Sequence, residues 1–184
     1  MKYKQRSYPE FSACGLNCGL CPRYYTKGSS RCPGCAGEGF SDVHPTCGIL
    51  SCCQRKKIEY CFECDEYPCK KYDGIDSTDS FITHRNQLTD MERAKKIGIE
   101  AYKAELDEKM RLLKILLDNY NDGKRTSFIC LAVNLFELED TQRLVKFITD
   151  NFGNDIPIKD RAKIIVEIFT NHAYICGISL KLRK

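Results

Sequence analysis

Apolar residues recur with a helical period in the second part of the chain. One stripe follows steps of three and four residues: Tyr102, Leu106, Met110, Leu113, Leu117 and Tyr120. This spacing predicts one face of a long helix, which the turn-forming residues of NYNDGKR end. Gly98 predicts a break before it, and Thr89 with Glu92 predicts a capping box at the start of this helix or of a shorter preceding one.

Two further amphipathic helices are predicted after the apolar segment SFICLAVNLFEL. The first is closed by Gly153 and has these apolar residues: Leu144, Val145, Phe147, Ile148 and Phe152. Pro157 suits the first turn of the last helix, one side of which carries Ala162, Ile165, Phe169 and His172. The tail ISLKLRK predicts at most a short strand. We therefore expect a bundle of three to five helices.

Residues 11–74 lack this periodicity and hold few large aliphatic side chains: Leu16, Leu20, Val43, Ile49, Leu50 and Ile58. A stretch of about sixty residues with so few cannot build a sufficient hydrophobic core by itself. The polar stretch KKYDGIDSTDS predicts the join. The predicted fold is mainly α, with a small irregular cysteine-rich metal-binding segment (11–74) packed with a C-terminal helical bundle (75–184).

The chain has 13 cysteines, and eleven of them fall in the first segment: Cys14, Cys18, Cys21, Cys32, Cys35, Cys47, Cys52, Cys53, Cys61, Cys64 and Cys69. The first residues lack the apolar stretch of a signal peptide, and no apolar run reaches the length of a membrane span. We therefore expect a cytoplasmic protein without membrane association, whose thiols stay reduced. An odd number of cysteines in that compartment favours metal binding over disulfides.

The spacing of the cysteines predicts two four-ligand metal sites. Two C-x2-C pairs joined by ten residues make a complete site: Cys18, Cys21, Cys32 and Cys35. A third pair, Cys61 and Cys64, needs two more ligands from four cysteines: Cys47, Cys52, Cys53 and Cys69. In this interpretation Cys14 stands outside the first quartet and joins the later cysteines. Other partitions remain open, and His44 could complete a site with three cysteines.

Zinc is the expected metal, as two structural ions, because four-thiolate zinc sites are the commoner structural choice. A [4Fe–4S] cluster is the alternative, since it takes the same ligands and is also found with a proline after a cluster cysteine. The run C-x3-C-x2-C at Cys14, Cys18 and Cys21 resembles the cluster motif of radical S-adenosylmethionine enzymes. Those enzymes carry the motif on a long barrel, whereas helical sequence follows here, which argues against that class.

Catalytic motifs and charge narrow the functions further. The sequence has no P-loop, no dinucleotide fingerprint, no H-E-x-x-H and no G-x-S-x-G. No catalytic signature is therefore identified, and the question of enzymatic activity stays open. Residues 1–75 hold eleven Lys and Arg against eight Asp and Glu. Each four-thiolate zinc site adds about two negative charges, which brings the loaded segment to about −1. This charge argues against nucleic-acid binding and favours a protein partner; the oligomeric state stays open.

Four remaining residues are interpreted as structural. Cys130 lies in an apolar run and suits a small buried hydrophobe, and Cys176 is assigned the same role. His84 and His172 are interpreted as isolated, and an isolated histidine is more often structural than a ligand.

The cysteine segment resembles an uncharacterised bacterial and archaeal family, domain of unknown function 3795. The stretches CGLNCGLCPRY, CPGC and YCFECDEYPCKKY carry the resemblance over residues 12–74. All cysteines of the family pattern are present, and Cys53 is additional. The resemblance implies a cysteine-rich, metal-binding module and transfers no established activity. Many members come from anaerobes, which strengthens the iron–sulfur alternative.

Two functional hypotheses follow. The first is a cytosolic metal-binding module, held by structural zinc, whose helical domain mediates interaction with a protein. The second is an iron–sulfur redox protein or another metalloenzyme.

Overall fold

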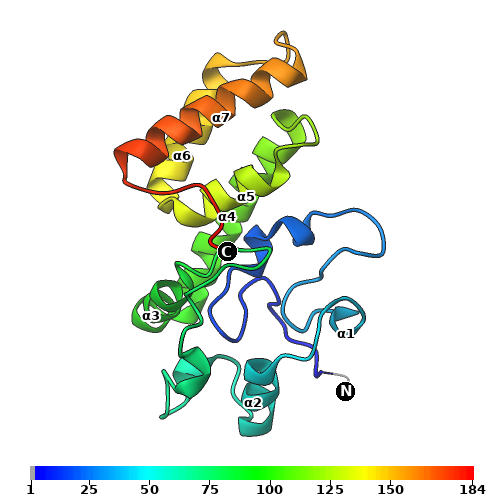
Figure 1. Ribbon diagram of the computed structural model, residues 1–184, viewed down its shortest axis with the longest axis vertical. Helices are drawn as coiled ribbons and strands as arrows, with labels where there is room; N and C mark the ends of the chain where they lie inside the picture. Colours follow the sequence, from blue (N-terminus) through cyan, green and yellow to red (C-terminus); the bar gives the residue numbers. More distant parts are fainter. Residues whose placement is uncertain (1–2) are drawn as a thin grey trace. The chain divides into compact units, whose positions relative to one another are not determined.

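The computed structural model describes residues 3–184, which divide into two compact units (Figure 1). The first unit ends at Leu106 and includes Leu182–Lys184; the second is Asp107–Lys181. Over the described range there is no β-strand and there are seven α-helices: α1 (Phe40–Val43), α2 (Gly48–Lys56), α3 (Gln87–Ile97), α4 (Ile99–Asn119), α5 (Thr126–Leu135), α6 (Leu138–Asn151) and α7 (Ile158–Ile175). The predicted mainly α fold is confirmed. Within residues 3–184, no helix has the length and apolar character needed to cross a bilayer.

The cysteine-rich segment consists mostly of turns and short helices. Four 3-10 helices lie at or beside cysteines: η1 (Cys18–Leu20), η2 (Pro22–Tyr24), η3 (Cys61–Glu63) and η4 (Lys70–Tyr72). The sequence pattern did not predict α2. Cys47 caps this helix, because its sulfur accepts a hydrogen bond from the backbone N–H of Leu50 at 3.5 Å. Lys57 ends it in the left-handed conformation, with φ of 57°.

Cysteines contribute to the hydrophobic core of the first unit. One buried cluster contains Ala13, Cys35, Ala36, Phe40, Leu50 and Cys53. Beside it, Phe11 is fully buried, with its ring centroid 4.6 Å from that of Tyr102 and 5.5 Å from that of Tyr60. The thiols thus occupy core positions that aliphatic side chains take in other domains of this size.

The loop that carries Cys14 is held against α3. Gly15 has a φ of +95°, and a Cβ atom there would lie 2.4 Å from the backbone oxygen of Gln87, so only glycine fits. The side-chain amide of Gln87 donates to the Cys14 carbonyl at 3.0 Å, and that of Asn17 donates to Asp90 at 2.8 Å. These bonds hold the loop that carries Cys14 in a fixed position on α3.

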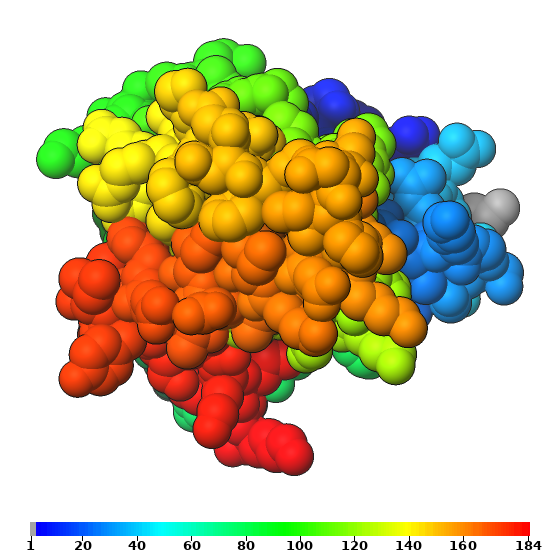
Figure 2. Space-filling view, turned by 90° about the horizontal axis from the view of Figure 1, so that it is seen from above, coloured from blue at the N-terminus to red at the C-terminus, as the bar shows by residue number. Residues whose placement is uncertain are grey.

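The second unit is a helical bundle with an apolar interior. Its α5 packs against α7, and α6 and α7 lie side by side with their surfaces meeting (Figure 2). Phe169 of α7 is fully buried and meets Phe136 edge-on at a centroid distance of 5.6 Å. Lys109 donates to the carbonyl of Phe136 at 2.6 Å and so satisfies a backbone group at the end of α5.

Most predicted helical features are confirmed, with two corrections, which concern Thr89 and Pro157. Gly98 ends α3 with a φ of +89°, and the predicted apolar stripe runs along α4. The capping box at Thr89 is wrong, because α3 starts earlier and Asn86 is its N-cap residue. Pro157 immediately precedes α7, and the tail forms no strand within the described residues. The predicted domain boundary at residues 74 and 75 stays a prediction.

The C-terminal tail is tied to the first unit through Asp79. The backbone N–H of Arg183 donates to Asp79 Oδ2 at 2.7 Å, and its guanidinium donates to Oδ1 at 3.0 Å. The side chain of Asp79 is fully buried. Two donors from one residue thereby compensate the cost of burying this carboxylate.

Candidate metal centres

The cysteines predicted as ligands all lie in the first unit and fall into two sets. The first set contains Cys14, Cys18, Cys21, Cys32, Cys35 and Cys47. Four of these thiols act electrostatically on Cys18: Cys35, Cys14, Cys21 and Cys32. Cys47 acts in the same way on Cys14 and Cys35. The structure therefore gathers the predicted quartet in one region, and Cys14 and Cys47 lie beside it.

Backbone hydrogen bonds position this first set. The N–H of Cys35 donates to the carbonyl of Pro9 at 2.8 Å, and that of Cys32 donates to Arg23 at 2.9 Å. Gly34, between the two cysteines, has a φ of +87°, and a Cβ atom there would lie 2.5 Å from the Pro9 oxygen. The CPGC turn is thus fixed against the backbone at Pro9, and its glycine is required for that approach.

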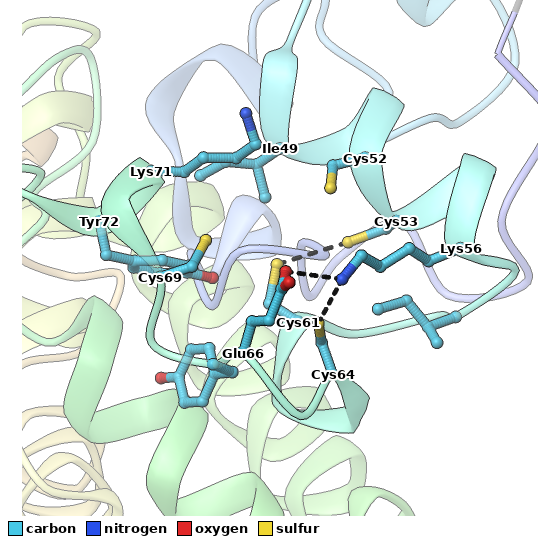
Figure 3. Close-up of a pocket in the computed structure, with 12 residues that line it drawn as sticks. Ile49, Cys52, Cys53, Lys56, Cys61, Cys64, Glu66, Cys69, Lys71 and Tyr72 are labelled. Atoms are coloured by element: carbon cyan, nitrogen blue, oxygen red, sulfur yellow. Dashed lines mark hydrogen bonds and ion pairs between the residues drawn. The ribbon is translucent and has the colours of Figure 1, made fainter.

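The second set lines a small cavity between α2 and the segment 61–69 (Figure 3). Its five cysteines are Cys52, Cys53, Cys61, Cys64 and Cys69. The cavity measures about 30 Å³, which is room for an ion or a few atoms, since one water needs about 10–15 Å³ on this scale. The sulfur atoms of Cys52, Cys53, Cys61 and Cys69 point into the same space. The arrangement suits an inorganic group better than an organic substrate.

Two thiols of the second set are in direct contact. The sulfur atoms of Cys53 and Cys61 lie 3.4 Å apart. The hydrogen bond from Cys53 lowers the pKa of Cys61 to about 7, and the same bond raises the pKa of Cys53. Of the two thiols, Cys61 is therefore the one that loses its proton more readily. A nucleophilic thiolate of this kind is also the form that binds metal.

Burial raises the pKa of several thiols of the first set. Burial, with a smaller contribution from the neighbouring Cys35, raises the pKa of Cys14 to about 12. Burial also raises the pKa of Cys18 well above its usual value, again with Cys35 adding to the effect. Several buried thiols this close cannot all ionise unless positive charge joins them. A metal ion or cluster would supply that charge.

The sulfur atoms are not all at the spacing of a single zinc ion. With Zn–S bonds of about 2.3 Å, tetrahedral geometry places the four sulfur atoms about 3.8 Å apart. Among residues 3–184, the group of three or more ligand-type side chains whose atoms all lie within 4.8 Å of one another contains Asp140, His172 and Cys176. No three thiols of the cysteine-rich segment meet that limit. A mononuclear zinc site in residues 11–74 would therefore draw the sulfur atoms closer together when the ion binds.

Comparison with protein families agrees with the cysteine pattern. Residues 10–74 match the family described as Protein of unknown function (DUF3795). The predicted resemblance is confirmed over this segment, which contains every thiol of both sets. No curated protein and no solved structure matches the chain. The match of this segment to the DUF3795 model, together with its many cysteines, is consistent with metal binding.

A buried arginine beside the first set was not predicted from the sequence. The Arg6 side chain is 3% exposed, donates to Phe11 at 2.7 Å and pairs with Glu59 at 2.8 Å. Burial lowers the pKa of Arg6, but the charges of Cys35 and Glu59 outweigh it, and the net shift is upward. Its Nη2 atom is buried without a hydrogen-bond partner among the described residues. A metal-bound thiolate would be a suitable acceptor for this orphaned donor, so the residues present fit such a group.

A lysine plays a similar part at the second set, on the exposed side. Lys56 donates to the sulfur of Cys64 at 3.0 Å and to Glu66 at 2.8 Å (Figure 3). The bonds to Glu66 and then to Cys64 raise the pKa of Lys56. Its positive charge would offset part of the negative charge of a thiolate centre. The run RKK in the sequence contains this residue, but only the fold brings it to Cys64.

The remaining candidates are placed as follows. His44 is exposed, its Nδ1 lies 2.9 Å from the Pro45 carbonyl, and its ring stacks on Phe40. Cys130 is buried in α5, as expected of a small hydrophobe. Cys14 lies with the first set, while its carbonyl accepts from the hydroxyl of Tyr72 at 3.3 Å. Which thiols share one metal, and whether His44 joins them, stay predictions.

Proposed function

We propose that the cysteine-rich segment is a metal-binding module in which two sets of thiolates hold metal and thereby maintain the fold. The observation that carries this proposal is the convergence of four sulfur atoms, from α2 and from the segment 61–69, on one small cavity. Burial of the first set supports it, because thiols in that environment ionise only with a cation beside them.

We propose zinc as the metal, with one structural ion in each set. The close pair Cys53 and Cys61, at 3.4 Å, supports this choice, since two thiolates on one zinc ion lie about 3.8 Å apart. The family's C-x2-C pairs are typical of such sites. When bound, the ions would stabilise the fold through metal–thiolate bonds. These bonds would supply folding free energy that a larger hydrophobic core supplies in other domains.

A [4Fe–4S] cluster is the second candidate, and the spacing of the thiols in residues 11–74 as a whole favours it. Each thiolate of such a cluster binds a different iron atom, so the sulfur atoms are held farther apart than on one zinc ion. No three thiols of the segment lie within 4.8 Å of one another. The buried charge of Arg6 would suit either centre, because both are net negative with four thiolates.

We further propose that the module works in the cytosol as a structural element that presents a surface to a protein partner. This rests on the charge of the loaded segment, about −1 with two four-thiolate zinc sites, which does not suit a nucleic acid. It also rests on the ligand count, since four protein ligands leave a zinc ion no open position for substrate.

Elemental analysis and absorbance of protein purified without oxygen test the proposal. Two zinc ions per chain in a colourless solution would support structural zinc and exclude the cluster. Iron with acid-labile sulfide in a brown solution would support the cluster and refute zinc. Protein that folds fully with neither metal would refute both forms of the module.

A further inference from the structure

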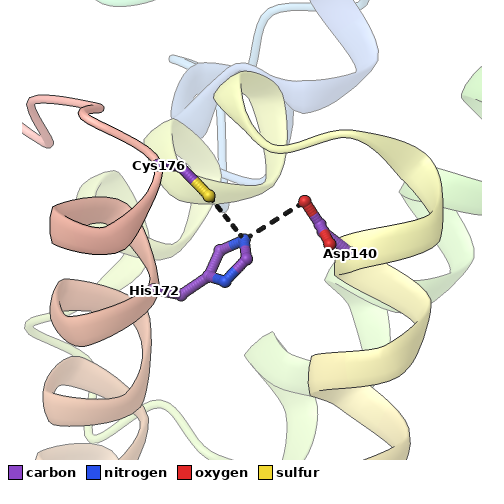
Figure 4. Close-up of side chains that lie close together, drawn as sticks. All are labelled: Asp140, His172 and Cys176. Carbon is purple, nitrogen blue, oxygen red and sulfur yellow. Dashed lines mark hydrogen bonds and ion pairs between the residues drawn. The ribbon is translucent and has the colours of Figure 1, made fainter.

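The second unit contains a cluster of three ligand-type side chains that the sequence analysis did not foresee. His172 lies on α7, Cys176 directly follows that helix, and Asp140 lies in the first turn of α6 (Figure 4). The interpretation of His172 as an isolated histidine is therefore wrong. The sequence did contain one signal, a His-x3-Cys spacing, which places two side chains on the same helix face.

The three ligand atoms converge on one point. His172 Nε2 lies 3.3 Å from Asp140 Oδ2 and 3.5 Å from Cys176 Sγ. Tetrahedral zinc with Zn–N and Zn–O bonds of about 2.05 Å and Zn–S of about 2.3 Å would separate the same atom pairs by about 3.3 and 3.6 Å. The observed distances match both values. All three atoms lie within 4.8 Å of one another.

The arrangement differs from that of a catalytic cysteine. In a nucleophile–histidine–carboxylate triad, the nucleophile and the carboxylate contact opposite nitrogens of the imidazole. Here the sulfur and the carboxylate both face Nε2 (Figure 4). The carboxylate is not placed to hold the ring for proton transfer from the thiol. Convergence on one nitrogen is the geometry of side chains that share a cation.

The end of α7 favours a cation as well. The site lies at the C-terminus of α7, a helix of 18 residues, where the helix dipole is negative. Arg143 binds the other oxygen of Asp140, Oδ1, at 2.7 Å and so leaves Oδ2 directed at the histidine. His172 is buried, its ring edge-on to Phe136 with centroids 4.8 Å apart, whereas Cys176 is exposed. Packing against Phe136 thus holds the imidazole of His172 in place, while the exposed Cys176 leaves the site accessible to ions from solvent.

We propose that Asp140, His172 and Cys176 form a mononuclear site for a divalent ion of zinc-like character. One carboxylate oxygen, one imidazole nitrogen and one thiolate form a mixed donor set that suits Zn²⁺ and excludes Mg²⁺ and Ca²⁺, which prefer oxygen ligands. Three protein ligands leave a fourth position for water or another small ligand, as in reactive zinc sites. Binding releases the thiol proton of Cys176. This site is independent of the thiolate centres in the first unit.

Zinc titration of the full-length protein, with its resident metal in place, tests the proposal. The chain has three histidines, so their imidazole nitrogens can be followed individually by NMR. The expected result is a shift of the His172 Nε2 resonance that saturates at one added zinc per chain, while His44 and His84 remain unchanged. Absence of a His172 shift at excess zinc would overturn the proposal.

Matched variants on the same surface sharpen the test. Cys176→Ser should weaken zinc binding at this site by more than about a hundredfold, because even changes outside the ligand set cost about 10- to 100-fold. Tyr174→Ser introduces the same residue two positions away, at a side chain that is 86% exposed, and should leave the affinity unchanged. Arg143→Gln should tighten binding, since a positive charge leaves the carboxylate. Equal affinities of wild type and Cys176→Ser would refute the site.

Discussion

The two units of this protein are stabilised in different ways. In the helical unit, large apolar side chains such as Phe136, Phe169 and Ile165 are fully or almost fully buried. In the cysteine-rich unit, Leu20 and Leu50 are the buried large aliphatic side chains of residues 11–74, and buried thiols belong to the same core. The difference teaches that cysteines of one chain can have different roles. Cys130 is a buried packing residue of α5, whereas the cysteines of residues 11–74 are candidate ligands. Neighbouring thiols and charges, rather than residue type, decide which role applies.

The largest expected effect separates the two units by their dependence on metal. A chelator, or Cys18→Ser or Cys35→Ser, should unfold the cysteine-rich segment, because a structural zinc site contributes about 10 kcal/mol or more to folding. Helices α5–α7 should keep their protection against hydrogen exchange. Hydrogen exchange followed by mass spectrometry measures both regions in one experiment. A cysteine-rich segment that stays protected after complete metal removal would contradict metal-dependent folding.

The opposite change should affect the helical unit and leave the metal in place. Phe169→Ala removes a fully buried ring and should cost about 3–5 kcal/mol of unfolding free energy. Metal content per chain should stay as in the wild type, which elemental analysis checks. Phe147→Ala is the control, because that ring is 50% exposed and its loss should change stability little. Loss of metal from Phe169→Ala would show that the units are not independent.

Arg6→Met tests whether buried charge supports the thiolates. Methionine preserves much of the packing but removes the donors to Phe11 and Glu59, which should cost about 2–3 kcal/mol. It also removes the positive charge beside Cys35, so metal should be lost to a chelator faster than from the wild type. Lys56→Met, at the exposed side of the second set, should show a smaller effect on both measurements. Equal chelation rates in Arg6→Met and wild type would argue against charge compensation.

The smallest effect concerns the tail and depends on pH. Burial raises the pKa of Asp79, but the bonds from Arg183 outweigh it, so the pKa lies well below its ordinary value. A lowered carboxyl pKa stabilises the folded state above the ordinary value, and this contribution is lost as the pH falls further. Arg183→Met should therefore be less stable by about 2 kcal/mol at neutral pH.

The difference between Arg183→Met and wild type should shrink in acid, below about pH 4. Denaturant unfolding of the two proteins at a series of pH values measures it, and the comparison cancels acid release of metal, which both share. A difference that stays constant down to the lowest pH would show that Asp79 does not carry the effect.

The local patterns of the sequence determined several features of this protein. The stripe from Tyr102 to Tyr120 predicted α4, and Gly98 predicted the break before it. Each of these signals acts over a few residues, so it does not depend on how the rest of the chain runs. Where local signals compete, as at Thr89, the pattern named the wrong cap.

The tertiary structure decided which distant side chains meet. Arg6 pairs with Glu59 fifty-three positions away, and Asp140 meets His172 from another helix. These pairings depend on the path of the backbone and on the packing of whole helices, which no short-range period encodes. The structure also divided the thiols into two sets and placed Cys14 beside the first. From the sequence, the cysteines were candidate ligands whose grouping stayed open. The fold determines which charged groups and thiols lie beside each cysteine, and these neighbours set its pKa.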